Sequence, residues 1–277
     1  MVDVLAIHGI NMHRSRRVAT AEAWRTSIVD GLVDLRSGHA ESLSVEFAFY
    51  GHLYNDGKSD AEAHYTAADV EPGFQTELIE AVAAGVQNES EQPADTKLWL
   101  PSPLQRALAA LQRSRLFDGC DSLLISFVKQ VDRYVHDTDF RADVLDEVAK
   151  AMQSSPHVVI AHSLGSVIAY DWLQHNEPPV RPGLLTLGSP LGFEAIRRRL
   201  DRPADRSRWP GTIRSWTNIA AHHDAVAMVK KLAPLYHPDI VDEPCDNPRR
   251  SAHAALCYLG NIRTARTIDK ALDAAQT

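Results

Sequence analysis

The chain has 277 residues, 44% of them hydrophobic, which is enough for one large folded domain with a sizeable core. Its formal net charge of -7 and the lack of a long basic block argue against nucleic acid as the main partner. The three cysteines have no C-x-x-C spacing, which argues against a disulfide framework and against a zinc site.

The apolar run at the start of the chain is too short for a signal peptide. No apolar stretch reaches the roughly 18 to 20 residues that a membrane-spanning helix needs. We therefore expect a cytoplasmic protein without stable membrane insertion.

The first elements alternate between strand and helix. Residues 2–7 form a short aliphatic run that ends at His8-Gly9, which is typical of a buried strand followed by a glycine turn. Residues 20–35 carry apolar side chains at spacings of three and four, which predicts a helix. Residues 43–50 alternate between apolar and polar, which predicts a second strand. This succession is how a parallel sheet begins.

The alternation of strand and helix patterns stops between residues 51 and 119. Residues 74–86 carry an apolar side chain every fourth position, and residues 100–117 form a second amphipathic pattern. Polar loops flank both patterns, and no strand pattern occurs between them. We interpret 51–119 as a helical insertion, a candidate lid, within a single domain that spans 1–277.

The second half of the chain returns to alternation. Residues 122–154 predict two helices divided near 136–139, with Thr138 or Asp139 as the cap of the second. The pattern then predicts strands at 156–161, 184–187 and 212–219, a helix from 166 to 174, and a closing helix from 256 to 275. The expected fold is of the α/β class, a mostly parallel sheet flanked by helices.

A candidate nucleophile lies at one of the predicted turns. Ser163 lies in Ala161-His162-Ser163-Leu164-Gly165, between a predicted strand and a predicted helix, which approximates the G-x-S-x-G pattern. Small residues two positions before and after the serine let strand and helix approach each other. The N–H of Leu164 can then point at a developing oxyanion. The alternative is a plain turn with an incidental serine.

A second oxyanion donor is expected after the first strand. His8-Gly9 ends that strand, and a loop in this position supplies a backbone N–H in comparable sheets. The N–H of Ile10 is the candidate, with Asn11 next to it. The alternative is a glycine that merely ends a strand.

The serine needs a base, and the base needs an orienting acid. Where the serine lies on such a turn between a strand and a helix, the three residues follow one another along the chain in the order serine, acid, histidine. Asp224 follows the strand at 212–219 and precedes residues 225–227, which we expect to begin a helix. It is the candidate acid, although it could serve only as the cap of that helix. Asp242 and Asp246 are the alternatives.

The candidate base is a histidine beyond the acid. Only His237 and His253 follow Asp224, and His253 lies among small residues just before the closing helix. We therefore expect His253 to be the base. His222 and His223 precede the acid, so we place them at the rim of a pocket. His162 is expected to be structural.

Taken together, these segments resemble bacterial α/β-hydrolases related to lipases and serine esterases. The resemblance covers most of the chain and rests on five segments, namely 7–10, 162–171, 185–192, 216–227 and 253–259. It implies an α/β-hydrolase fold without the usual N-terminal edge strands, and a triad of Ser163, Asp224 and His253. Ala161 departs from the more common glycine, and no acidic residue lies near Ala221, where the related pattern often has one.

The expected activity is hydrolysis of a carboxylic ester, through an acyl-enzyme, without a cofactor or metal. The substrate is a small-molecule ester or a lipid-like ester, with thioesters and lactones as chemically similar alternatives. A non-catalytic binding or scaffold protein that keeps the fold is the alternative from another class. The 13 histidines suggest a metal-dependent hydrolase, but pairs such as His222-His223, or His8 with His13, lack metal-ligand spacing.

Overall fold

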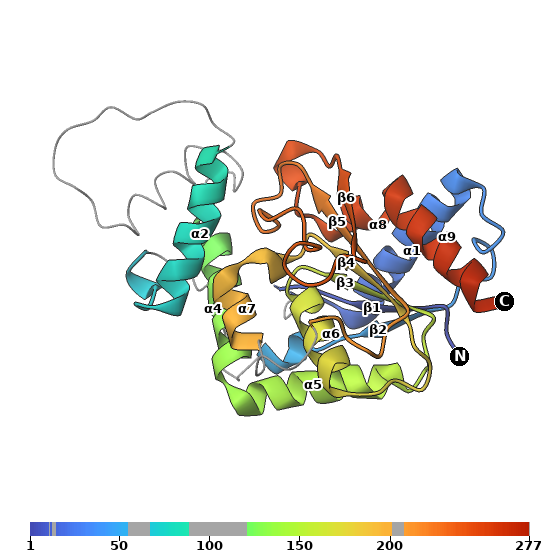
Figure 1. Cartoon of the computed structure of the whole chain (residues 1–277), viewed down its shortest axis with the longest axis horizontal. Helices are drawn as coiled ribbons and strands as arrows, with labels where there is room; N and C mark the ends of the chain where they lie inside the picture. Colours follow the sequence, from blue (N-terminus) through green and yellow to red (C-terminus); the bar gives the residue numbers. More distant parts are fainter. Residues whose placement is uncertain (11, 13–14, 55–66, 89–120, 201–207, 277) are drawn as a thin grey trace.

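A parallel β-sheet with helices on both faces forms the protein (Figure 1). The computed structural model describes residues 1–277 apart from 11, 13–14, 55–66, 89–120, 201–207 and 277. The described strands are β1 (Val4–Ile7), β2 (Val45–Ala48), β3 (Val158–His162), β4 (Gly183–Leu187), β5 (Ser215–Ala221) and β6 (Val241–Cys245).

The sheet has the strand order β2-β1-β3-β4-β5-β6, and every neighbouring pair is parallel. In β1, Val4 lies opposite Val45 of β2 and Val158 of β3. The expectation of a mostly parallel sheet of the α/β class is therefore confirmed, and the described sheet is wholly parallel. Because all strands point the same way, the loops that follow them gather at one edge.

Strand β6 is absent from the sequence prediction. It contains Asp242, Glu243 and Pro244, so it carries neither a hydrophobic run nor a clean alternation. Proline lacks the N–H that an interior strand needs, and β6 lies at an edge of the sheet, where proline is tolerated. The prediction of a helix that begins at residues 225–227 is also wrong, because turns and bends link β5 to β6.

The helices form one layer on each face of the sheet. One layer contains α1 (Arg17–Leu35), α8 (Ala255–Leu259) and α9 (Ile262–Gln276). The other contains α5 (Thr138–Met152) and α6 (Leu164–His175) against the sheet, with α2 (Phe74–Asn88), α4 (Asp121–His136) and α7 (Glu194–Leu200) beside them. Short 3₁₀ turns occur at η2 (Gly51–Tyr54), η4 (Ala67–Asp69), η5 (Pro190–Gly192) and η6 (Arg249–Ser251).

The pleat of β1 explains why the strand is apolar at every position. Val4 and Ala6 belong to the hydrophobic cluster under α1, α8 and α9, whereas Leu5 and Ile7 belong to the cluster on the opposite face. A strand covered on both faces has no solvent-facing side, so it reads as a continuous hydrophobic run.

The cap of α5 and the continuity of the closing helix differ from the prediction. Asp137, not Thr138 or Asp139, caps α5, because its Oδ1 accepts a hydrogen bond from the Phe140 N–H at 2.9 Å. The closing helix is interrupted, since α8 ends at Leu259 and α9 begins at Ile262.

The first helix of the predicted insertion is part of the hydrophobic core. Leu78, Ile79 and Val82 of α2 are fully buried, in the cluster that also contains side chains of α4. Residues 100–117, where the second helix is expected, lie outside the described residues. The role of 51–119 as a lid therefore stays a prediction.

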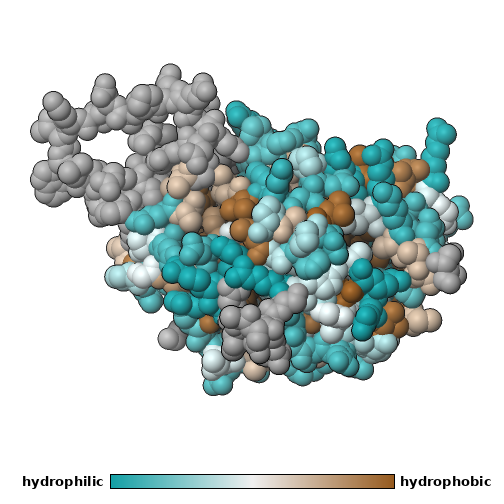
Figure 2. Space-filling view, viewed as in Figure 1, coloured by the Kyte–Doolittle hydropathy of each residue, from teal (hydrophilic) through white to brown (hydrophobic). Residues whose placement is uncertain are grey.

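On the face seen in Figure 2, hydrophobic residues form small separate patches among hydrophilic ones. Among the helices of the described part, none combines the length and the apolarity that crossing a membrane requires.

A buried polar cluster fixes α6 against its neighbouring helices. The carboxylate of Asp171, which is 1% exposed, accepts hydrogen bonds from Tyr134 Oη of α4 and from Arg141 Nε of α5, both at 2.6 Å. A charge with several donors is tolerated inside a protein, and removal of one donor is costly. The cluster therefore joins α6 to α4 and α5.

Candidate active site

The loops after β1 and β3 meet at the edge of the sheet where the strands end. From β1 the chain moves outward to β2, and it returns on the other side of β1 at β3, so the strand order reverses between β1 and β3. A Cβ built on Gly9, just after β1, would lie 2.7 Å from Cβ of Ser163, just after β3. In open α/β sheets, ligands bind outside the carboxyl ends of the strands at such a reversal.

Ser163 occupies a strained turn between β3 and α6. Its backbone has φ 54° and ψ -128°, a conformation that non-glycine residues adopt at a cost of about 1 to 3 kcal/mol. The Ser163 N–H donates to the carbonyl of Leu187 in β4 at 3.0 Å. Its carbonyl accepts hydrogen bonds from the N–H and the hydroxyl of Ser166 at 2.9 and 2.6 Å. Neighbouring elements therefore hold the strained conformation in place.

The small residues of the motif are required by close packing. A Cβ on Gly165 would lie 2.4 Å from the carbonyl oxygen of His8 and 2.5 Å from that of Ile7. These are backbone atoms, so a larger residue would force α6 away from β1. Ala161 is fully buried within β3, where its methyl group fits.

Ser163, His253 and Asp224 form one hydrogen-bonded chain, as the sequence predicts. The Ser163 hydroxyl lies 2.9 Å from Nε2 of His253, and Nδ1 of His253 lies 2.8 Å from Oδ2 of Asp224. Because a carboxylate can only accept, Nδ1 carries the proton and Nε2 is free to accept from the serine. The three residues come from the turn after β3, the loop after β5 and the segment before α8.

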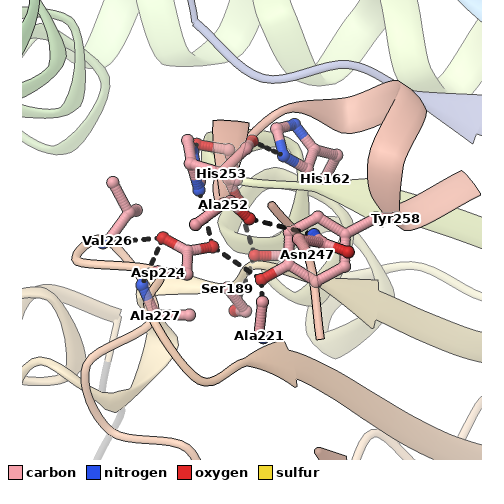
Figure 3. Close-up of polar contacts among 12 residues, drawn as sticks. His162, Ser189, Ala221, Asp224, Val226, Ala227, Asn247, Ala252, His253 and Tyr258 are labelled. Carbon is pink, nitrogen blue, oxygen red and sulfur yellow. Dashed lines mark hydrogen bonds and ion pairs between the residues drawn. The ribbon is translucent and has the colours of Figure 1, made fainter. Parts of the chain in front are cut away.

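Asp224 is buried, and both oxygens of its carboxylate accept hydrogen bonds (Figure 3). Its Oδ1 accepts from the N–H groups of Val226 and Ala227, at 2.9 and 3.3 Å. Its Oδ2 accepts from Tyr258 Oη at 2.6 Å, in addition to His253. Burial raises the pKa of Asp224, but nearby His253, the hydrogen bonds from His253 and Tyr258, and the charge of Lys230 lower it to about 2. The carboxylate is therefore ionised at neutral pH.

The alternative acids have other structural partners. Asp242 accepts hydrogen bonds from the N–H groups of Leu232 and Ala233, at 2.8 and 2.9 Å, and so holds the loop before β6. Asp246 pairs with His222, whose Nδ1 lies 2.7 Å away, and both side chains are largely exposed. The geometry thus brings Asp224, and neither alternative, to His253.

His162 makes a contact that the sequence does not reveal. Its Nε2 donates to the backbone carbonyl of His253 at 2.8 Å, and the two ring centroids lie 4.7 Å apart (Figure 3). Burial and the nearby His253 lower the pKa of His162 to about 3, so the ring is neutral at ordinary pH. The structural role expected for His162 is therefore a specific one, because it holds the backbone of the candidate base.

The His8-Gly9 loop is fixed by a second neutral imidazole. Nδ1 of His8 donates to the Gly9 carbonyl at 2.6 Å, and its Nε2 accepts from the Tyr50 N–H at 3.1 Å. Tyr50 Oη donates to the carbonyls of His8 and Gly9, at 2.6 and 3.2 Å. Burial lowers the pKa of His8 to about 4, which is consistent with a neutral ring.

This arrangement bears on the candidate oxyanion donors. The Gly9 carbonyl faces His8 and Tyr50, and in a trans peptide the following N–H points the opposite way. The Ile10 N–H is therefore directed away from those two residues. Leu164 is the first residue of α6, so its N–H is one of four that the helix cannot pair itself. Asn11 lies outside the described residues.

Among the described residues, no group of three or more histidine, cysteine, aspartate or glutamate side chains is arranged to hold a metal ion. Comparison of the chain with models of known protein families, with curated proteins and with solved structures yields no match.

Proposed function

We propose that this chain is a serine hydrolase of the α/β-hydrolase fold that cleaves a carboxylic ester. The observation that supports this most strongly is the chain of contacts from Ser163 through His253 to Asp224, at 2.9 and 2.8 Å. A serine hydroxyl is a weak nucleophile until a base oriented by a third group accepts its proton. The backbone strain at Ser163 agrees with a functional serine, because such strain concentrates at active sites.

The reaction proceeds through an acyl-enzyme. Ser163 Oγ attacks the carbonyl carbon while its proton moves to Nε2 of His253. The tetrahedral intermediate collapses as the bond to the alcohol oxygen breaks, and His253 returns the proton to that oxygen. A water molecule then attacks the acyl-enzyme with His253 again as base, which releases the carboxylic acid and restores the serine. Asp224 stays ionised and stabilises the imidazolium that forms in each step.

Backbone N–H groups stabilise the oxyanion in this proposal. The donors are the N–H of Leu164 at the start of α6 and the N–H of Ile10 after the His8-Gly9 turn. Donors of this kind lie in a site shielded from water, where each contributes about 2.7 to 4 kcal/mol to the stability of the transition state.

Access to the serine governs the choice of substrate. Ser163 is fully buried, whereas the His253 side chain is 29% exposed. An ester would therefore approach Ser163 from the side on which the His253 side chain is exposed. Small esters have the lowest barrier to this entry, so the proposal is tested first with short acyl chains before lipid-like ones.

The test is hydrolysis of p-nitrophenyl esters with acyl chains from acetate to dodecanoate. We expect turnover by the wild type and a loss to background in Ser163→Ala, since removal of a triad serine costs roughly 10⁶-fold in kcat. Ser154→Ala is the matched control, because the Ser154 hydroxyl bonds to the Ala151 carbonyl, remote from the triad. A folded wild type that hydrolyses none of these esters would contradict the proposal and favour a non-catalytic binding protein.

A further inference from the structure

Tyr258 contacts the carboxylate that faces the candidate base. This residue of α8 is fully buried, and its hydroxyl lies 2.6 Å from Oδ2 of Asp224 (Figure 3). The same oxygen accepts the hydrogen bond from Nδ1 of His253 at 2.8 Å. The phenol and the imidazole therefore share one acceptor atom.

The direction of the Tyr258 hydroxyl proton follows from its other partner. The N–H of Ala221, at the end of β5, donates to Tyr258 Oη at 2.8 Å. The phenol oxygen accepts that bond, and its single proton is left for Asp224. Burial and the adjacent Asp224 raise the pKa of Tyr258 far above its usual range, so the phenol keeps its proton.

Backbone packing fixes this phenol in place. Gly188, after β4, has φ 56°, and a Cβ on it would lie 3.0 Å from the Tyr258 ring, 2.8 Å from Asp224 Oδ2 and 3.2 Å from His253 Nδ1. The turn after β4 thus closes over all three groups. The phenol, the carboxylate and the imidazole therefore all pack close to the backbone of Gly188.

We propose that Tyr258 is a positioning residue that sets both the orientation of Asp224 and the charge that Asp224 presents to His253. Its effect on a reaction rate rests on the proposed hydrolase function, whereas its effect on the Asp224–His253 hydrogen bond does not. The structure contains a matched comparison, because Tyr134 Oη also donates at 2.6 Å to Oδ2 of a buried carboxylate, that of Asp171.

The sign of the charge effect follows from linkage. A phenol donates more strongly to a free carboxylate than to one already compensated by an imidazolium. The Tyr258 hydrogen bond therefore compensates part of the negative charge of Asp224, and its removal leaves more of that charge facing the His253 ring.

Other titratable groups near the pair are His162 on β3, Lys230 in the loop after β5 and Cys245 on β6. His162 is neutral, and burial raises the pKa of Cys245 to about 12, so the thiol is also neutral. The ammonium of Lys230 donates to the carbonyls of Ala221 and Asp224, at 2.6 and 2.9 Å. Tyr258→Phe removes none of these groups, so its effect on the pH–rate profile is assigned to the lost hydroxyl.

The first test compares Tyr258→Phe with Tyr134→Phe in labelling by a fluorophosphonate. For Tyr258→Phe we expect the maximal labelling rate to fall about tenfold, less than the roughly 10²-fold cost of a misplacement of about 1 Å. The half-saturating probe concentration should not change. The acid limb of the pH–rate profile should move to higher pH. Tyr134→Phe should lose stability but keep the wild-type rate, probe affinity and pH profile.

The second test does not depend on activity. We expect the proton between His253 Nδ1 and Asp224 to give a low-field ¹H NMR resonance, and His253→Ala should remove it. Its chemical shift should change in Tyr258→Phe and stay constant in Tyr134→Phe. If Tyr258→Phe fails to fold, 3-fluorotyrosine at position 258 replaces it, because a more acidic phenol is a stronger donor and should move the acid limb to lower pH.

A Tyr258→Phe protein with wild-type labelling, pH profile and resonance would overturn the inference. So would a 3-fluorotyrosine protein with an unmoved acid limb. If the wild type is not labelled at all, the hydrolase proposal fails, and the resonance alone decides whether Tyr258 controls the Asp224–His253 bond.

Discussion

Replacement of Gly165 by alanine tests the close approach of α6 to β1 that forms the turn at Ser163. The new Cβ would lie 2.4 and 2.5 Å from the carbonyl oxygens of His8 and Ile7, so helix and strand must separate. Alanine improves helix propensity by about 1 kcal/mol, whereas overpacking costs about 1 to 3 kcal/mol. Because the obstructing atoms are backbone, we expect the upper end of that cost and a net loss of roughly 2 kcal/mol in the free energy of unfolding.

The matched control is Gly31→Ala in α1, where the nearest atom to a new Cβ would be Cβ of Ala265 at an ordinary 3.4 Å. There the helix propensity acts alone, and we expect a gain of up to about 1 kcal/mol. Urea unfolding measures both variants, and fluorophosphonate labelling reports the position of Ser163. Gly165→Ala with wild-type stability and wild-type labelling would show that α6 does not need this close approach to β1.

Three further predictions follow from buried polar groups. Asp224→Asn should lower kcat by about 10⁴-fold in p-nitrophenyl ester hydrolysis, because an amide N–H₂ facing the imidazole reverses its tautomer; an activity within tenfold of wild type would argue against the triad. The lowered pKa values of His8, about 4, and His162, about 3, mean that the unfolded chain binds protons first as the pH falls below 6.5. Stability should thus be complete above about pH 6.5 and decline below it by about 1.4 kcal/mol per pH unit for each ring, which urea unfolding between pH 7 and 5 measures; a flat profile would contradict it. Arg141→Leu should cost about 3 kcal/mol in thermal or urea unfolding, since it leaves the buried carboxylate of Asp171 without its guanidinium partner; an unchanged midpoint would contradict that.

The sequence predicts those parts of the fold whose signal is local. Strand β1 is apolar at every position because both faces are covered, and the turn at Ser163 shows itself through the strand before it and the helix after it. Asp224 and His253 follow from the chain order of serine, acid and base. Each of these inferences uses neighbouring residues or their order along the chain.

The remaining features depend on tertiary contacts. Strand β6 is polar and contains Pro244, so only its place at the sheet edge makes it a strand. Asp224 does bind the N–H groups of Val226 and Ala227, as a helix cap would, but the chain continues in turns instead of a helix. Tyr258 lies 34 residues from Asp224 along the chain, and no local pattern marks it as a partner.

The proposed hydrolase function requires Ser163 to be an activated nucleophile. The most direct measurement is intact-protein mass spectrometry after exposure to a fluorophosphonate, followed by peptide mapping. We expect one phosphonyl group per wild-type chain, on Ser163, with no labelling of Ser163→Ala and full labelling of Ser154→Ala. A folded wild type that gains no mass, or a label carried by another residue, would show that Ser163 is not an activated nucleophile.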